Sequence, residues 1–232
     1  MKLEDEETFV VNTFWRYQNY IPLRPKYHVI ADTFCFPEKN KELTAWVEEL
    51  FENKNKIQES GTHLFLNIIG KEFVEKNNLF PKNAVSYMVL HGFFRDNMKF
   101  NIKIDKVIPE VKNVILACLI IAVYMGFEKI YLLGCEHDFL AYQNHYNGFK
   151  HFYKTRDYNQ LDPHEVKYYA LDIFSYEEHI NHVRMLFKNY RLFKTKITKT
   201  HPNVTIYNAT PNSFLDIFPF VKFDNIKFQE NV

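Results

Sequence analysis

Residues 113–138, NVILACLIIAVYMGFEKIYLLGCEHD, decide the fold of this chain. The first half is apolar on nearly every side, which predicts a helix that lies buried rather than half in water. Gly126 follows directly, at a place where a positive φ ends many helices and glycine adopts it without strain. Residues 129–133, KIYLL, are apolar with little alternation, which is typical of a strand covered on both faces.

Polar residues follow this strand at once, in the order Gly134, Cys135, Glu136, His137 and Asp138. In open α/β sheets, ligands bind beyond the carboxyl ends of the strands. A buried helix that leads into a buried strand ending in Glu-His-Asp is therefore the strongest indication of a site in this sequence.

The rest of the chain alternates between strand-like and helix-like segments. Strands are expected at 8–11, 27–31, 63–69, 85–90, 129–133 and 204–207, and helices at 37–53, 71–76, 113–125, 176–196 and, as a short turn, 214–218. Residues 93–106 read as an irregular crossover. This alternation predicts the α/β class, with a mainly parallel Rossmann-like sheet flanked by helices, in a single domain over residues 1–232. Ser175 and Glu178 form a capping box at the start of the last long helix.

The composition excludes several classes of protein. Lys and Arg (29) nearly balance Asp and Glu (28), so the net charge of +1 gives no case for a nucleic-acid partner. The three cysteines show no CxxC spacing, which fits a reducing compartment. The acidic start lacks the regions of a signal peptide, and the longest apolar run is too short to span a bilayer. A soluble, cytoplasmic protein is expected.

Polar residues stand at the ends of several expected strands: Asn12, Asp32, Glu136 and the segment 208–213. Because the carboxyl ends of parallel strands meet at the same edge of a sheet, these residues are predicted to lie on one rim. Asn12 and Asp32 can hold a ribose or a base through hydrogen bonds. Taken singly, each more often closes a strand-to-loop turn.

Residues 139–174 are aromatic, rich in imidazole and without periodicity, which predicts a lid segment. The phenols of Tyr142 and Tyr146 can donate to a departing phosphate, and the imidazole of His151 can take a proton from an attacking hydroxyl. The alternative is an aromatic cluster that pins the segment to the domain. The two interpretations carry about equal weight.

Three further patterns have competing interpretations. Glu136, His137 and Asp138 with two later histidines can bind Zn²⁺ or Mn²⁺, but their spacing matches no recognised metal site. Asn212 and Ser213 lie in TPNS, which can present backbone N–H groups to a phosphate or simply cap a helix. The basic amphipathic helix at 176–196 can touch an anionic membrane surface, although such a helix more often packs with a solvated face.

The chain resembles bacterial Rossmann-like glycosyltransferase-type proteins. The resemblance rests on GFEKIYLLGCEHD after the buried helix, the later HFY, and the closing IYNATPNSFLDIF. It covers nearly the whole chain. This group includes the CMP-sialic-acid-dependent sialyltransferases of surface-glycan synthesis and a family related to the MptE-like hydroxymethylpterin pyrophosphokinases of archaea.

The resemblance implies roles for particular residues. Asn12 matches an asparagine that contacts the nucleotide, and Asp32 stands where the family has a second asparagine. Tyr142 and Tyr146 correspond to two lid tyrosines that stabilise the leaving phosphate. His151 is the nearest match to the family's general base. The family's closing Pro-Asn-Ser corresponds to Pro211, Asn212 and Ser213.

One departure concerns the start of the chain. Members of the family begin with a strand and a Gly-Asn-Gly-Pro-Ser loop that cradles the nucleotide phosphates, and nothing of this kind precedes Thr8. The chain is therefore expected to be truncated or to have its start assigned downstream. Such a loss would remove the phosphate cradle and expose an edge of the sheet.

The leading hypothesis is a metal-independent glycosyltransferase that moves a sugar from a nucleotide-activated donor, CMP-linked by resemblance, to a surface-glycan acceptor. In it, Asn12, Asp32, Glu136, Asn212 and Ser213 hold the nucleotide, and no other cofactor takes part. The expected location is the cytoplasm, at the inner face of the membrane if the basic helix binds lipid. Two alternatives remain: an MptE-like phosphotransferase with Mg²⁺ at Glu136 and Asp138, and a non-catalytic module that serves a partner enzyme.

Overall fold

The computed structural model describes residues 3, 5–37, 45–96, 102–138, 140 and 175–228. Within them the chain forms two compact units, Met1–Tyr124 and Met125–Val232. The catalytic candidates Tyr142, Tyr146 and His151, and with them nearly all of the expected lid, lie outside the described residues.

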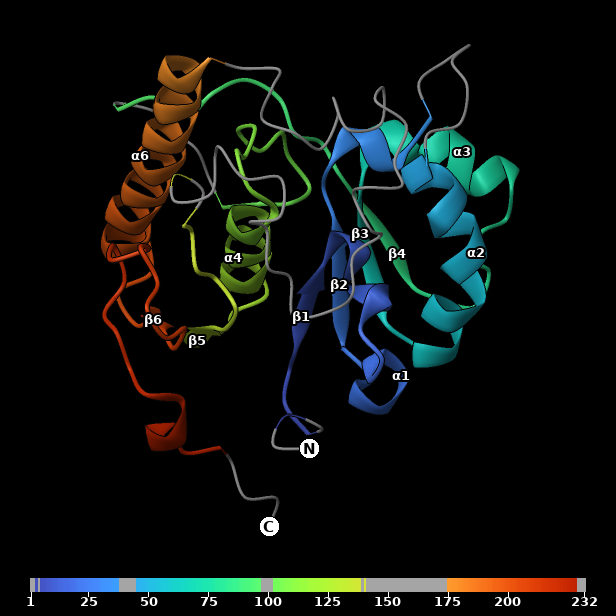
Figure 1. The fold of residues 1–232 in the computed structure, drawn as a ribbon, viewed down its shortest axis with the longest axis horizontal. Coiled ribbons are helices and arrows are strands. Elements are labelled where there is room, and N and C mark those ends of the chain that lie inside the picture. The colour runs from blue at the N-terminus through green and yellow to red at the C-terminus, as the bar shows by residue number, and fades with distance from the viewer. Residues whose placement is uncertain are drawn as a thin grey trace. The chain divides into compact units, whose positions relative to one another are not determined.

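The first unit contains a parallel sheet of four strands in the order β1-β2-β3-β4 (Figure 1). The strands are β1 (Phe9–Val11), β2 (Tyr27–Ile30), β3 (His63–Asn67) and β4 (Val85–Met88). Its α-helices are α1 (Tyr20–Leu23), α2 (Ala45–Ser60), α3 (Lys71–Lys76) and α4 (Val114–Tyr124). A parallel sheet flanked by helices confirms the predicted α/β, Rossmann-like fold. In the described part of the chain, β1 pairs only with β2 and is therefore an edge strand.

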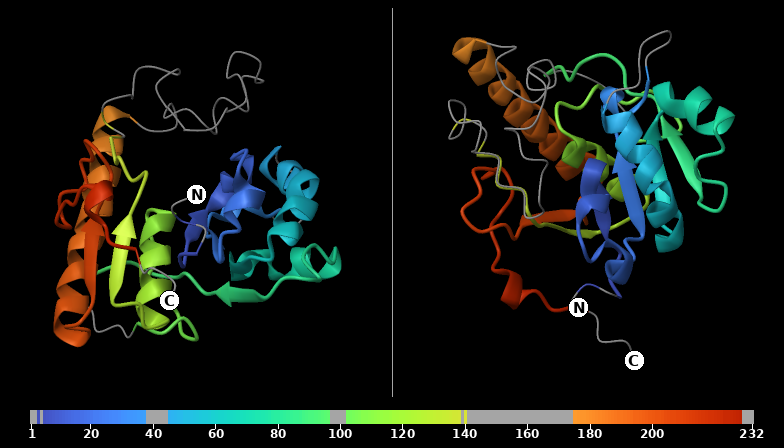
Figure 2. Two further views of the ribbon diagram at one scale, coloured as in Figure 1. Left: turned by 90° about the horizontal axis from the view of Figure 1, so that it is seen from below. Right: turned by 45° about the vertical axis from the view of Figure 1, so that its right-hand side comes forward.

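Both faces of this sheet are buried, because successive side chains of a strand point to opposite sides. Ile30 and Leu64 belong to a core cluster with Leu50 of α2, whereas Val29 and Phe65 belong to a second cluster with α4 (Figure 2). This two-sided burial explains why the central strands are almost continuously apolar rather than alternating.

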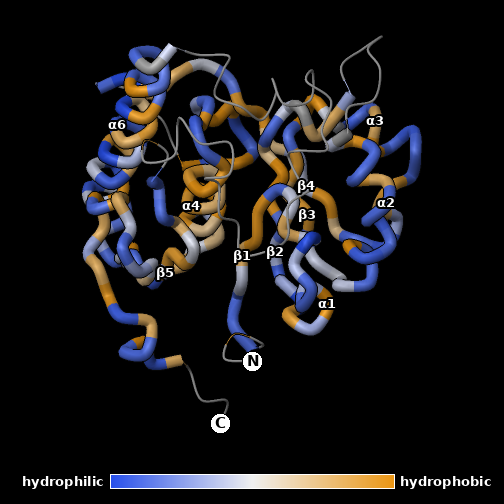
Figure 3. Tube along the Cα trace, viewed as in Figure 1, coloured by the Kyte–Doolittle hydropathy of each residue, from blue (hydrophilic) through white to orange (hydrophobic). Residues whose placement is uncertain are grey.

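The predicted buried helix is present as α4, and nine of its side chains are buried. Its hydrophobic character runs along its length (Figure 3). Gly126 follows with φ of 90°, as expected for a residue that ends a helix. Helix α2 extends beyond the predicted end at Asn53 and stops at Ser60, because Ile57 continues its buried stripe and Gly61 turns the chain with φ of 71°.

The second unit pairs β5 (Lys129–Leu132) in parallel with β6 (Thr205–Asn208) and contains α6 (Tyr176–Thr200). The predicted capping box is present: the Ser175 hydroxyl accepts from the Glu178 N–H at 3.3 Å, and the Glu178 carboxylate accepts from the Ser175 N–H at 2.7 Å. One stripe of α6 is buried and lies at helical spacing, namely Leu186, Tyr190, Phe193 and Ile197.

Two predictions for this unit are wrong. Strand β5 is not covered on both faces, because Lys129 and Tyr131 are exposed while Leu132 is buried. The Tyr131 ring stacks on Tyr207 of the neighbouring strand, with centroids 5.4 Å apart, and so gains contact without burial. No helix forms at 214–218, because the chain turns there and returns to β6, where Asn208 bridges to Phe220.

No helix in the described residues has both the length and the apolar character that crossing a membrane requires.

Candidate functional site

Asn12 stands directly after β1 in a left-handed conformation, with φ of 44°. Asparagine is among the few residues other than glycine that tolerate this region. Two hydrogen bonds hold it there. Its carbonyl accepts from His28 Nε2 at 2.7 Å, and its side-chain Nδ2 donates to the carboxylate of Asp32. The structure thus brings together Asn12 and Asp32, at the carboxyl ends of β1 and β2 as predicted.

The Asn12–Asp32 pair is rich in hydrogen-bond acceptors. The Oδ1 atom of Asn12 is buried and has no hydrogen-bond partner among the described residues. It lies on the same side chain whose amide donates to Asp32. Asp32 is half-buried; burial raises the pKa of its carboxyl, and the hydrogen bond from Asn12 acts in the opposite direction. An unpaired carbonyl oxygen beside a carboxylate fits a ligand that carries hydroxyl or amino donors.

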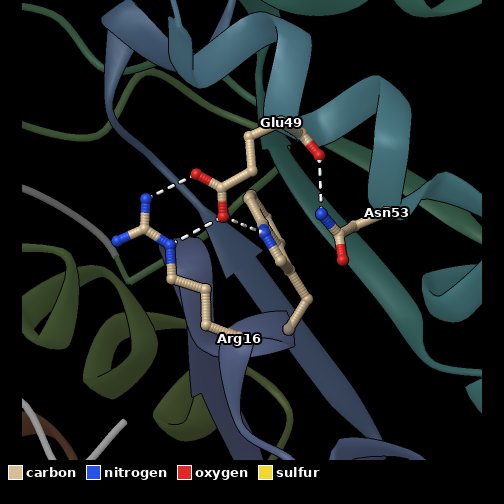
Figure 4. Close-up of polar contacts among 4 residues, drawn as sticks. Arg16, Glu49 and Asn53 are labelled. Atoms are coloured by element: carbon tan, nitrogen blue, oxygen red, sulfur yellow. Dashed lines mark hydrogen bonds and ion pairs between the residues drawn. The ribbon is translucent and has the colours of Figure 1, made fainter. Parts of the chain in front are cut away.

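The segment after β1 is held against α2 by a buried ion pair (Figure 4). Arg16 donates to both oxygens of Glu49, at 2.6 and 2.5 Å, and Trp15 Nε1 donates to the same carboxylate at 2.9 Å. Lys56 donates to the carbonyls of Trp15 and Tyr17. The segment Asn12–Arg16 is consequently a fixed 3₁₀ turn. It is not a glycine-rich loop leading into the N-terminus of a long helix, which is the usual arrangement for a bound phosphate.

Asn67, at the carboxyl end of β3, is a residue that the sequence analysis missed. It is buried, its Nδ2 donates to the Ala31 carbonyl at 2.9 Å, and its Oδ1 accepts from the Ile69 N–H at 3.2 Å. It therefore ties the loop after β3 to the residue that precedes Asp32. The available signal was a polar residue directly after the apolar run HLFL, the same pattern that singled out Asn12.

In the second unit, Ser213 joins the ends of both strands. Its hydroxyl donates to the Cys135 carbonyl at 2.5 Å and accepts from Asn208 Nδ2 at 2.9 Å and the Leu215 N–H at 3.1 Å. The Glu136 carbonyl accepts from the Phe214 N–H at 2.8 Å. The structure therefore brings together Glu136 and Ser213, and the Ser213 hydroxyl is occupied in holding the two loops.

Glu136 and Asn212 present their side chains to solvent. Both residues are exposed, and Asn212 has a left-handed backbone with φ of 55°. Of the three predicted nucleotide-binding residues in this unit, Glu136 and Asn212 therefore have side chains that a ligand can reach. Asn212 directly precedes the Ser213 hydroxyl that fixes the loop, so its backbone position is well defined.

His137 points into the interior, away from the exposed Glu136. It is buried, has φ of 55°, and its Nε2 lies 3.0 Å from the hydroxyl of Tyr190 in α6. Burial lowers the pKa of His137, so the ring is held as the neutral imidazole. Glu136 and His137 therefore do not face a common ligand. Among the described residues, no group of three or more His, Cys, Asp or Glu side chains is placed to hold a metal ion.

The two sets of residues belong to different units, Asn12 and Asp32 to the first and Glu136, Asn212 and Ser213 to the second. That they share one rim stays a prediction, as do the catalytic roles of Tyr142, Tyr146 and His151. Comparison with family models, curated proteins and solved structures finds no match for this chain.

Proposed function

We propose that this protein is a metal-independent glycosyltransferase that uses a nucleotide-activated sugar, CMP-linked, and a surface-glycan acceptor. The observation that carries the proposal is the Asn12–Asp32 pair at the carboxyl ends of two adjacent parallel strands. Ligands of such sheets bind at this edge, and an acidic residue after the second strand is a common partner of a ribose hydroxyl.

The pair supports recognition of the ribose or base rather than the phosphate. A phosphate carries acceptors and would meet the Asp32 carboxylate and the Asn12 carbonyl oxygen unfavourably. A ribose diol or an exocyclic amine carries donors. An unpaired buried acceptor costs about 1–3 kcal/mol, so a ligand that donates to Asn12 Oδ1 would recover much of this cost on binding.

The reaction follows from the resemblance. His151 would take the proton of an acceptor hydroxyl, whose oxygen forms a bond to the anomeric carbon of the donor sugar. The bond between that carbon and the phosphate oxygen breaks, and the nucleotide leaves with the electron pair. Tyr142 and Tyr146 would donate hydrogen bonds to the departing phosphate. Glu136 and Asn212, exposed in the second unit, would contact the remainder of the nucleotide.

The first test is binding without metal. Calorimetric titration with CMP, 2′-deoxy-CMP, UDP, GDP and ATP, each with and without Mg²⁺, should give an affinity for CMP that EDTA leaves unchanged. A 2′-hydroxyl that donates to the Asp32 carboxylate makes a hydrogen bond to a charged group, worth about 1.5–3 kcal/mol, so 2′-deoxy-CMP should bind at least tenfold more weakly. Asn12→Ala removes both the Oδ1 acceptor and the amide that donates to Asp32, and should weaken binding by a similar factor. Asn77→Ala is the matched control, because Asn77 is exposed and follows α3.

Binding of ATP with Mg²⁺ alone would refute the transferase and favour the phosphotransferase. Absence of binding by every nucleotide would leave the non-catalytic module. If CMP binds, transfer from CMP-sialic acid should then fall in His151→Ala and Tyr142→Phe. Transfer that these two substitutions leave unchanged would refute the assigned catalytic roles.

The exposed stripe of α6 supports peripheral contact with a membrane. The exposed Arg184, Arg191 and Lys199 and the half-buried Lys188 recur on the side opposite the buried stripe, and α6 has no acidic residue after Glu178. Near an anionic bilayer each cation contributes about 1 kcal/mol. Four cations would therefore give roughly 4 kcal/mol of attraction, enough for binding at low ionic strength.

Vesicle sedimentation tests this contact. The protein should bind vesicles that contain anionic phosphatidylglycerol and should not bind vesicles of pure phosphatidylcholine. Arg184→Glu with Arg191→Glu should abolish binding, and Lys71→Glu with Lys76→Glu in α3 is the control. Binding that survives the α6 reversal would exclude this helix as the lipid surface.

A further inference from the structure

His28 lies behind the Asn12–Asp32 pair, in the middle of β2, and is completely buried. A buried imidazole in a strand needs partners for both ring nitrogens. His28 has them: Nε2 lies 2.7 Å from the Asn12 carbonyl and Nδ1 lies 2.9 Å from the Tyr20 hydroxyl. His28, Asn12 and Tyr20 all belong to the first unit, as does the candidate site.

The directions of these hydrogen bonds follow from the chemistry of the partners. A carbonyl oxygen can only accept, so Nε2 carries the hydrogen and donates to Asn12. Burial lowers the pKa of His28 to about 4, which leaves Nδ1 without a proton at neutral pH. Nδ1 therefore accepts from the Tyr20 hydroxyl. One tautomer satisfies both contacts, whereas the reverse tautomer would place an unprotonated Nε2 against the Asn12 carbonyl oxygen, 2.7 Å away.

The ring has no freedom to turn away. Tyr20 and Trp15 are completely buried, and both ring centroids lie 5.7 Å from that of His28. Ser60 Oγ lies 3.4 Å from the Tyr20 hydroxyl and closes the far side. Three charged groups border this cluster: Lys56 lies 5.7 Å from the centre of the Tyr20 ring, the Glu49 carboxylate accepts from Trp15 Nε1 at 2.9 Å, and Asp32 accepts from the Asn12 side chain.

We propose that His28 is a positioning residue for the nucleotide site: its Nε2–H holds the Asn12 carbonyl and so fixes the left-handed turn that aims the Asn12 side chain. At φ of 44°, Asn12 adopts a conformation that is rare for residues other than glycine, and such conformations persist where the surroundings hold them. Two side chains of β2 and the loop after it hold Asn12 in place: Asp32 accepts from its side-chain amide, and His28 donates to its backbone carbonyl.

A matched pair of substitutions separates the two ends of the imidazole. His28→Gln places an amide N–H near the position of Nε2, and so retains the donor to Asn12 while losing the acceptor for Tyr20. His28→Asn places its amide near Nδ1, and so retains the contact with Tyr20 while losing the donor to Asn12. Both variants are polar, unbranched at Cβ and smaller than histidine, so a general loss of packing should affect both.

Two readouts are needed, because this inference rests on the proposed function. The first is the dissociation constant for CMP: His28→Asn should weaken binding at least tenfold, as Asn12→Ala does, and His28→Gln should stay within about threefold of the wild type. The second needs no nucleotide. The Asn12 side-chain ¹H–¹⁵N resonances report the hydrogen bond to Asp32, and they should move toward free-amide positions in His28→Asn but not in His28→Gln.

The outcomes are distinguishable. If the wild type binds no nucleotide while the Asn12 resonances follow the predicted pattern, the proposed function fails and the positioning role stands. If Asn12→Ala weakens CMP binding but His28→Asn does not, or if both His28 variants behave alike in both readouts, the positioning role is refuted. His63→Gln serves as a control, because His63 begins β3 and bonds Ser86 at the other end of the strands. If His28→Asn does not fold, His28→Leu replaces it, because leucine also lacks the donor to Asn12. CMP should then bind His28→Gln within about threefold of the wild type and bind His28→Leu at least tenfold more weakly.

Discussion

The buried, neutral His28 should make the stability of the protein depend on pH. Burial lowers its pKa in the native state from 6.5 to about 4, whereas in the unfolded chain it returns to its ordinary value. Between these two values the unfolded state binds more protons than the native state, so stability increases with pH. The contribution of the neutral His28 to the free energy of unfolding is complete above pH 6.5 and is lost as the pH falls toward 4. Within this window, each fall of one pH unit lowers the free energy of unfolding by about 1.4 kcal/mol. The total loss by pH 5 is therefore about 2 kcal/mol.

Urea unfolding at pH 7.5 and pH 5.0, followed by circular dichroism, measures this loss. Burial also lowers the pKa values of His63 and His137, so the wild type alone does not isolate His28. The comparison with His28→Gln does, because glutamine does not titrate and the other histidines are common to both proteins. The wild type should lose about 2 kcal/mol more than the variant between the two pH values. Equal losses in the two proteins would show that His28 is not a desolvated neutral imidazole, and the tautomer argument would fall with it.

Three further substitutions test the contacts that hold the site, each by urea unfolding. Arg16→Met should cost about 3 kcal/mol, because it leaves the Glu49 carboxylate without its cation; adding Glu49→Gln, which removes the charge and keeps an acceptor for Trp15 Nε1, should recover most of the loss, and no recovery would show that the charge of Glu49 is not what Arg16 offsets. Gly70→Ala should cost about 1–3 kcal/mol, because a Cβ there would overlap the buried Phe36 ring, and Phe36→Leu should relieve it. Ser213→Ala should cost about 1–3 kcal/mol, because it removes the acceptor of the Leu215 N–H and of one Asn208 N–H and the donor to the Cys135 carbonyl; a change under 0.5 kcal/mol, roughly that of a surface substitution, would contradict this role.

The sequence was sufficient to predict those features that depend on local pattern. The uniform apolar character of α4, the glycine that ends it and the capping box of α6 each have a direct physical cause within a few residues. The pairing of Asn12 with Asp32 was also predictable, because both follow strands that are neighbours in the chain and in the sheet. A polar residue after each of two adjacent parallel strands is therefore enough to predict the contact between Asn12 and Asp32.

Other features depend on partners that lie far away in the chain. A run such as KIYLL reads as buried on both sides, but whether Tyr131 is covered depends on how many layers surround its strand. The sequence places His28 within a strand but does not identify its partners. Its two ring nitrogens contact the Tyr20 hydroxyl and the Asn12 carbonyl, which only the folded structure brings to either side of the ring. The TPNS pattern predicts a ligand contact or a helix cap at Ser213, but it does not reveal that the Ser213 hydroxyl donates to the Cys135 carbonyl in the loop after β5.

The pairing of β5 with β6 also bears on how the protein can diversify. These two strands are hydrogen-bonded neighbours, yet the chain between them includes α6 and all of residues 139–174. The entropy of closing a loop grows only slowly with its length, by about 0.6 kcal/mol for each doubling. Insertions and deletions within residues 139–174 therefore impose little cost on the pairing of the two strands. Under the proposed function, changes in the length and composition of the segment that carries Tyr142, Tyr146 and His151 would alter the choice of acceptor while the β5–β6 pair stays the same.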